Sequence, residues 1–80
     1  MKTPRELIPE FVKSSMLRQL EANKHKGDNW HEMTDKQILF ELYYHVGKLQ
    51  AALMAKDILL INEYCGDIAN IVGFTLDIKS

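Results

Sequence analysis

Apolar side chains recur at intervals of three and four residues along almost the entire chain, and this spacing restricts the chain to α-helices. Such spacing gathers the side chains on one face of a helix, whereas a strand would require alternation at every second residue. No segment of the sequence alternates in that way. The recurring positions form three groups: Ile8, Val12, Met16 and Leu20; Ile38, Leu42, Val46, Leu49 and Leu53; and Ile61, Cys65, Ile68, Val72 and Leu76. We therefore predict an all-α fold, a three-helix chain that forms a helical bundle.

The first helical region is predicted to cover residues 1–23. Thr3 and Glu6 have the spacing of a capping box, which favours a helix start. Pro9 lacks a backbone N–H and crowds the preceding turn. We therefore expect a short opening turn and then a helix from about Pro9 to Asn23. Residues 24–33 form a polar connection rich in the turn formers Gly27, Asp28 and Asn29.

The second and third helices have clearer boundaries. Thr34 with Gln37 three residues later predicts the start of a helix over residues 34–56, and Asp57 is the expected cap of a helix over residues 57–78. Glycine inside a helix costs about 1 kcal/mol relative to alanine. Gly66 and Gly73 therefore indicate a place where another helix or a ligand approaches the third helix closely.

The 80 residues make one domain, residues 1–80, with a net charge of −1. A chain this short rarely buries enough apolar area by itself, so we expect a homodimer or a higher homo-oligomer to complete the bundle. The balanced charge gives no support for nonspecific nucleic-acid binding. No apolar run approaches a membrane span, and the single Cys65 fits a reducing compartment, so we expect a cytoplasmic protein with no membrane partner.

Two polar stripes interrupt the apolar pattern, one on each of the last two predicted helices. On the third helix the stripe follows helical spacing: Glu63, Asp67 and Asn70. On the second helix the matching positions are Glu41, Tyr44, His45 and Lys48. Polar groups on a helix that is otherwise apolar need a metal, a ligand or opposite charge on a neighbouring helix. We therefore expect the functional site where these two stripes meet.

The segments Gly27–Thr34, Leu39–Ala52 and Glu63–Asp77 resemble the MazG-like all-α nucleoside triphosphate pyrophosphohydrolases, especially the short, often phage-encoded members. The most specific part of the resemblance is Asp67-Ile68-Ala69-Asn70 with the downstream Asp77. The resemblance implies a helical dimer or tetramer. It also implies that an E-E-x-x-E run on one helix and an E-x-x-D run on the next hold Mg²⁺, which activates water to cleave a nucleotide between its α and β phosphates.

This chain departs from the family pattern at the metal site. The E-E-x-x-E run is replaced by Tyr44, His45, Val46, Gly47 and Lys48. At the E-x-x-D positions, Tyr64 replaces the glutamate and only Asp67 keeps its carboxylate. Mg²⁺ requires several oxygen ligands, and one carboxylate beside a lysine is a poor site for it. We therefore expect a degenerate metal site and no cofactor, with Asp67 as the one candidate metal ligand.

Two interpretations remain open for Lys48. In the first, Lys48 pairs with Asp67 or Glu63 and fills the former metal position, as ion pairs commonly do where helices meet. In the second, the region binds a phosphate or nucleotide without metal through His45, Lys48 and the hydroxyl groups of Tyr44 and Tyr64. Both hold if the pair opens when a ligand binds.

Five other residues have predicted roles. Asn70 is a candidate ligand hydrogen-bonding group, because a buried amide is costly to leave unpaired. Trp30 either stacks a base beside the basic connection or, as we favour, closes the loop over the core. His25 and His31 are expected to be solvated, and Cys65 is expected to pack on the apolar face of the third helix.

Three functions are compatible with these patterns. The first is a catalytically degenerate MazG-like protein that binds a nucleotide-like or phosphate-bearing ligand or a partner protein, with the role of a phage or prophage accessory protein. The second is a Mg²⁺-dependent pyrophosphohydrolase with a relocated site at Glu41, Glu63 and Asp67. The third is a purely structural module that dimerises through its helices. We favour the first.

Overall fold

The computed structural model consists of helices joined by short connections, and it describes residues 1–24 and 29–80. Three α-helices account for most of these residues: α1 (Pro4–Ala22), α2 (Asp35–Ala55) and α3 (Ile58–Lys79). A short 3₁₀ helix, η2 (Asn29–Glu32), precedes α2. The described ranges contain no strand, so the prediction of an all-α helical bundle is confirmed. The expectations for His25, Gly27 and Asp28 fall outside the described residues.

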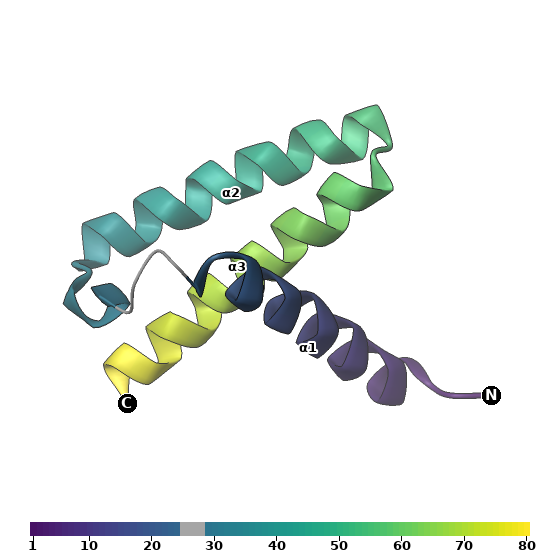
Figure 1. Cartoon of the computed structure of the whole chain (residues 1–80), viewed down its shortest axis with the longest axis horizontal. Coiled ribbons are helices and arrows are strands. Elements are labelled where there is room, and N and C mark those ends of the chain that lie inside the picture. The colour runs from purple at the N-terminus through teal and green to yellow at the C-terminus, as the bar shows by residue number, and fades with distance from the viewer. Residues whose placement is uncertain (25–28) are drawn as a thin grey trace.

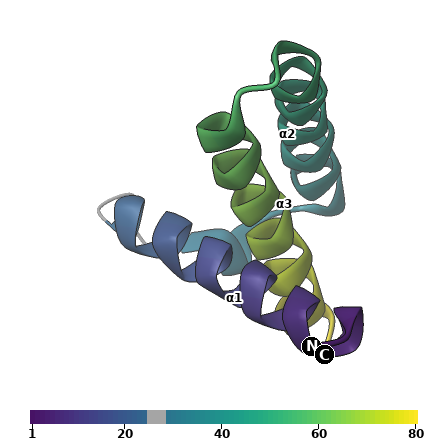
Figure 2. The same ribbon diagram turned by 90° about the vertical axis from the view of Figure 1, so that its right-hand side faces the viewer.

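The helix α3 is the centre of the arrangement. Figures 1 and 2 show α2 running antiparallel beside α3, while α1 crosses α3 from another side. Within the described residues α1 and α2 each pack on α3, but they do not pack on each other. The ion pair between Lys79 Nζ and Asp35 Oδ1, at 2.7 Å, joins the end of α3 to the start of α2. None of the described helices combines the length and apolar character that crossing a bilayer requires.

The predicted break at Pro9 is wrong, because α1 runs without interruption from Pro4. The Glu6 carboxylate accepts a hydrogen bond from the Thr3 hydroxyl at 3.1 Å, so the capping interaction starts the helix upstream of the proline. Pro9 removes the amide that would bond the carbonyl of Arg5. Both residues are exposed, so water can satisfy that carbonyl.

The predicted boundaries of α2 and α3 agree with the structure. Thr34 Oγ1 accepts from the Gln37 amide at 3.2 Å, and the Asp57 carboxylate accepts from the Leu60 amide at 3.2 Å. Between the two helices Lys56 adopts a left-handed backbone conformation with a φ of 55°. This residue reverses the chain, and the amide of Asp57 then donates to the carbonyl of Ala52 at 3.0 Å.

The small residues of α3 receive α1. A Cβ on Gly66 would lie only 2.6 Å from the Ser15 carbonyl oxygen, whereas one on Gly73 would meet the Met16 methyl at 3.7 Å. The Ser15 hydroxyl also donates to the carbonyl of Asn62. The predicted close approach is therefore correct, but a helix of the same chain makes it.

Few apolar side chains are covered. Among the described residues only Ile38 and Ala52 are buried apolar side chains. Val46 and Leu53 were predicted in the core of α2 and are exposed, because each four-residue step turns about 40° beyond a full turn and carries the stripe away from α3.

The predicted apolar faces of α1 and α3 are also largely open. On α1 the covered part is the crossing at Ser15 and Met16, while the flanking apolar residues are exposed: Ile8, Phe11, Val12, Leu17 and Leu20. The prediction that Cys65 is packed is wrong in this chain, since its side of α3 faces neither α1 nor α2 and the thiol is exposed.

Candidate functional site

The two polar stripes meet where His45 of α2 lies between two carboxylates. Its Nε2 atom is 3.7 Å from Asp67 Oδ2 on α3, and its Nδ1 atom is 3.8 Å from Glu41 Oε2, one turn earlier on α2. The side chains of His45 and Asp67 are both largely covered, with 17% and 18% exposed. The structure thus brings Glu41 and His45 of one predicted stripe close to Asp67 of the other.

The hydrogen bonding of His45 determines which of its nitrogens carries a proton. Nδ1 lies 2.8 Å from the backbone carbonyl of Glu41, and a carbonyl oxygen can only accept, so Nδ1 carries hydrogen. Nε2, which faces Asp67, is then an acceptor in the neutral ring and a donor in the protonated ring. When His45 is protonated, both ring nitrogens are donors, with Nδ1 facing the Glu41 carbonyl and Nε2 facing the Asp67 carboxylate. The neutral ring leaves Nε2 able to accept a proton or hydrogen bond from a ligand.

Glu41, His45 and Asp67 lie at one part of a cleft of about 560 Å³ between the ends of α1 and η2 and the sides of α2 and α3. Its volume is within the range of small-molecule sites, about 300–1,000 Å³. The ionisable groups that line it are three carboxylates, one lysine and one histidine: Glu32, Glu41, Asp67, Lys24 and His45. Its lining is therefore acidic, whether His45 is protonated or not.

An aromatic wall closes another part of the cleft. The rings of Trp30 and Phe74 are stacked, with centroids 4.7 Å apart and planes inclined by 15°. Both residues line the cleft. The neighbouring His31 Nε2 lies 3.1 Å from Asp77 Oδ2, which ties η2 to the end of α3. Trp30 therefore covers α3 as we favoured, and it also contributes an aromatic surface to the cleft.

Asn70 is the most buried polar side chain of the cleft, with 6% of its surface exposed. Its amide Nδ2 donates to the Met16 carbonyl at 3.1 Å and so links α3 to α1. Its Oδ1 atom is buried, and no residue in the described ranges bonds it. The predicted ligand-binding residue is therefore first a helix-crossing residue, with one acceptor still unsatisfied.

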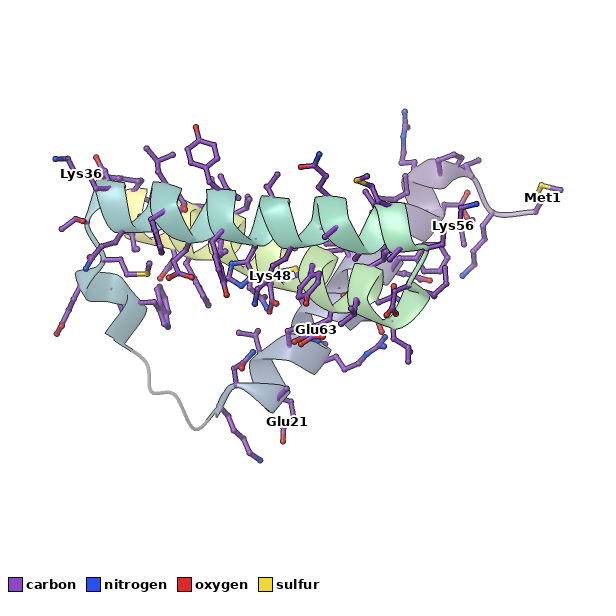
Figure 3. All side chains as sticks on the ribbon, turned by 90° about the horizontal axis from the view of Figure 1, so that it is seen from above. Met1, Glu21, Lys36, Lys48, Lys56 and Glu63 are labelled. Carbon is purple, nitrogen blue, oxygen red and sulfur yellow. The ribbon has the colours of Figure 1, made fainter. Side chains whose placement is uncertain are left out.

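The other predicted site residues lie outside the cleft lining. The Lys48 ammonium is 4.4 Å from the ring centroid of Tyr44 and 5.5 Å from that of Tyr64, in the position labelled in Figure 3. A hydrogen bond with Tyr44 raises the pKa of Lys48 above its usual value, partial burial opposes this, and the charges of Tyr44, Tyr64 and Asp67 add to the increase. Lys48 is thus attracted to Asp67 but is held over two aromatic rings. Glu63 is half-buried on α3, one turn before Asp67.

The donor set for a metal is not assembled in the described part of the chain. No group of three or more histidine, cysteine, aspartate or glutamate side chains is placed there to hold a metal ion. The relocated set of Glu41, Glu63 and Asp67 is therefore not brought together as a metal site.

Sequence reasoning missed several residues of the cleft. Phe74 follows Asp67 by seven residues and Asn70 by four, so the helical spacing that defined the polar stripe also pointed to it. Gln37 precedes Glu41 by four residues and was assigned only to capping. Ile71 follows Asp67 by four residues on α3. The remaining lining residues come from the end of α1, the position after it and the segment before α2: Gln19, Leu20, Asn23, Lys24, Glu32 and Met33. No spacing along the chain relates these residues to α3.

The chain matches no protein-family model, no curated protein and no solved structure in the three comparisons made with known proteins. The resemblance to the MazG-like pyrophosphohydrolases therefore stays a prediction from the motif residues. The interpretation of the site rests on its own geometry.

Proposed function

We propose that this protein acts by binding a small ligand in the cleft, without carrying out catalysis. The observation that supports this is the convergence of His45, Asp67 and Glu41 in one cleft with the stacked pair of Trp30 and Phe74. Sites for small ligands combine an apolar or aromatic wall with a few placed polar groups in this way.

The charge of the lining restricts the ligand. Because carboxylates outnumber cationic groups, a bare phosphate would be repelled, and a planar group with N–H donors would be favoured. A nucleobase-like ring fits this chemistry: its face packs against the aromatic wall and its amino groups donate to Glu41 and Asp67. For a nucleotide-like ligand, we place the phosphate toward Lys24, the one lysine of the lining, which lies just after α1 and pairs with Glu21 at 2.7 Å.

The proposal includes a relationship to the MazG-like family as a short, phage-type member with a degenerate metal site. The support is the motif Asp67-Ile68-Ala69-Asn70 with Asp77 downstream. The replacement of the family's glutamates by Tyr44, His45 and Lys48 supports binding over hydrolysis, because these side chains do not supply the oxygen ligands that Mg²⁺ requires. An accessory role in a phage or prophage is part of the same proposal.

We further propose that the working form is a homodimer. Only Ile38 and Ala52 are buried apolar side chains in the described residues, which is too small an interior for a chain of this length. Apolar residues on all three helices are exposed and available for association. A second copy would cover them, and a host protein is the alternative partner.

Calorimetry of the full chain tests ligand binding. We would titrate nucleobases, nucleosides and nucleotides in buffer that contains EDTA, and compare Asp67→Ala with Lys48→Met. Asp67 lines the cleft, whereas Lys48 does not. We expect a base-containing compound to bind without metal, Asp67→Ala to weaken binding about tenfold or more, and Lys48→Met to retain it.

Two outcomes would overturn the proposal. Absence of heat with every compound would remove the binding function. Release of pyrophosphate from a nucleotide with Mg²⁺ or Mn²⁺, lost in Asp67→Ala, would replace it with the enzyme alternative.

A further inference from the structure

After its first turn, where Asp35 and Lys36 are exposed, α2 carries its charges on the side that faces the rest of the molecule. Glu41, His45 and Lys48 are at least half-buried and turned toward α3. The exposed residues between positions 39 and 55 are all uncharged. In a monomeric amphipathic helix the charged face would point to water and the apolar face inward. The reversed arrangement indicates that the outer side of α2 is covered in the working protein.

We define the outer face of α2 by its exposed residues that lie opposite α3. These are Leu39, Phe40, Tyr43, Val46, Gly47, Gln50, Ala51, Leu53 and Met54. In both Figure 1 and Figure 2, α2 forms an edge of the molecule, with α1 and α3 on its other side. Figure 3 shows Lys36 and Lys56 at the two ends of α2, beyond the limits of the face, while Lys48 between them is turned toward Tyr64 of α3.

The outer face has the area of a stable interface. Its six large side chains remain between 45% and 79% exposed in the single chain. Aromatic side chains bury about 150–250 Å² each, and stable interfaces bury about 800 Å² per partner, so this face supplies an area of that order.

We propose that the outer face of α2 is the surface on which a second copy of this chain docks. In a two-fold symmetric dimer a residue close to the axis meets its own copy, so a charge there would meet a like charge. This face has no charge between positions 39 and 54 and meets its own copy without that repulsion. It also lacks the charges with which a heterologous partner would be selected.

The spacing along α2 favours an antiparallel contact centred between Val46 and Gly47. Residues 39, 43, 46, 50 and 53 follow the four- and three-residue steps of a helix-packing seam. An antiparallel copy centred there places Leu39 opposite Met54, Phe40 opposite Leu53, and Tyr43 opposite Gln50. The last pair matches a hydroxyl to an amide, so the polar groups of the face satisfy each other.

Gly47 explains how the two helices approach. Among the described residues, no atom outside the adjoining turns of α2 lies within 4 Å of a Cβ built on Gly47, so its lack of a side chain serves no packing against them. At the centre of the proposed interface, Gly47 and Ala51 allow the helix backbones to come close. This inference rests on the homodimer part of the proposed function and specifies its surface.

Substitution of Gly47 tests this surface, because the expected effect is opposite for an outer face that is free and for one that is covered by a second copy. On a free face, Gly47→Glu and Gly47→Gln would both stabilise α2, because glycine is a poor helix former. On the proposed interface, Gly47→Glu weakens the dimer about 100-fold or more, because two like charges meet near the axis, and Gly47→Gln weakens it less. Sedimentation of the full chain at several concentrations measures the effect, with Ser14→Glu on exposed α1 as the control for added charge.

A cross-linking experiment keeps the proposal testable should Gly47→Glu fail to fold. In a Cys65→Ser background, Gly47→Cys should form a disulfide-linked dimer on mild oxidation, whereas Lys13→Cys on exposed α1 should not. A dimeric wild-type protein that lacks the position-47 cross-link and is unaffected by Gly47→Glu would overturn this surface alone. A monomeric wild-type protein would overturn the homodimer itself. A stable complex with a different protein on this face would replace the second copy as occupant.

Discussion

The backbone carbonyl of Ser15 on α1 occupies the space that a side chain on Gly66 of α3 would need. A Cβ at Gly66 would lie 2.6 Å from that oxygen and 2.9 Å from the carbonyl carbon. Backbone atoms cannot rotate away as a side-chain end can. The crossing of α1 over α3, and with it the wall that α1 contributes to the cleft, therefore depends on this glycine.

Gly66→Ala is expected to destabilise the protein by about 1–3 kcal/mol, although alanine is the better helix former by about 1 kcal/mol. The matched control is Gly73→Ala on the same helix, where the new methyl meets only the Met16 methyl at 3.7 Å. We expect that variant to be neutral or stabilised by up to about 1 kcal/mol. Urea denaturation measures the free energy of unfolding of both variants. Equal values would contradict the close approach of α1 to Gly66.

Asn70→Ala is expected to cost about 1–3 kcal/mol, because it removes the donor to the Met16 carbonyl. The matched control is Asn62→Ala, because the side chain of Asn62 is exposed and has no comparable role across the crossing. Thermal denaturation should therefore separate the two variants. An equal loss of stability in both variants would show that the Asn70 amide does not stabilise the packing of α1 on α3.

Lys56→Gly is expected to stabilise the turn between α2 and α3 by about 0.5–1 kcal/mol. Lys56 has a φ of 55°, a conformation that costs a side-chain-bearing residue about 1–2 kcal/mol, partly offset by the greater freedom of glycine in the unfolded chain. Ala55→Gly, one position earlier and within α2, should instead destabilise by up to about 1 kcal/mol. Chemical denaturation of both variants checks the predicted opposite signs.

The position of Lys48 predicts how its contribution to stability changes with pH. Its hydrogen bond with Tyr44 and its attraction to Tyr44, Tyr64 and Asp67 raise the pKa of Lys48 in the folded state above the ordinary value of 10.5. Folding then favours the protonated form of Lys48. This stabilisation is fully present below the ordinary pKa of 10.5 and is lost as pH rises through the pKa of the folded state. Lys48→Met should therefore be less stable than wild type at neutral pH.

The difference between wild type and Lys48→Met should narrow only in strongly alkaline solution. Denaturation at a series of pH values measures this difference, and Lys36→Met, at an exposed position on α2, controls for loss of one positive charge. A difference that disappears below pH 10.5 would contradict the raised pKa.

Local interactions explain which expectations about the fold were correct. The caps at Thr34 and Asp57 involve residues three positions apart, so their pattern is visible along the chain. The error at Pro9 has the same local origin. The proline predicts a break between an opening turn and the helix, but the loss of a single hydrogen bond does not break α1.

The candidate site was only partly predictable. Helical spacing identified His45, Asp67 and Asn70, because side chains three and four residues apart share a face. It could not indicate which of the possible partners each would meet. Lys48 was expected to pair with Asp67 or Glu63 or to hold a phosphate, and it lies over the Tyr44 ring.

Sequence pattern alone was enough to place α2 and α3, their caps and the small residues of α3, because these depend on contacts within a few positions. Three further features follow from the packing of distant helices: α1 crosses at Gly66, Glu41 and His45 meet Asp67, and the outer face of α2 is left uncovered. The physical reason is that helical periodicity defines faces but not their neighbours. Which face is buried depends on the angle and position at which distant helices pack.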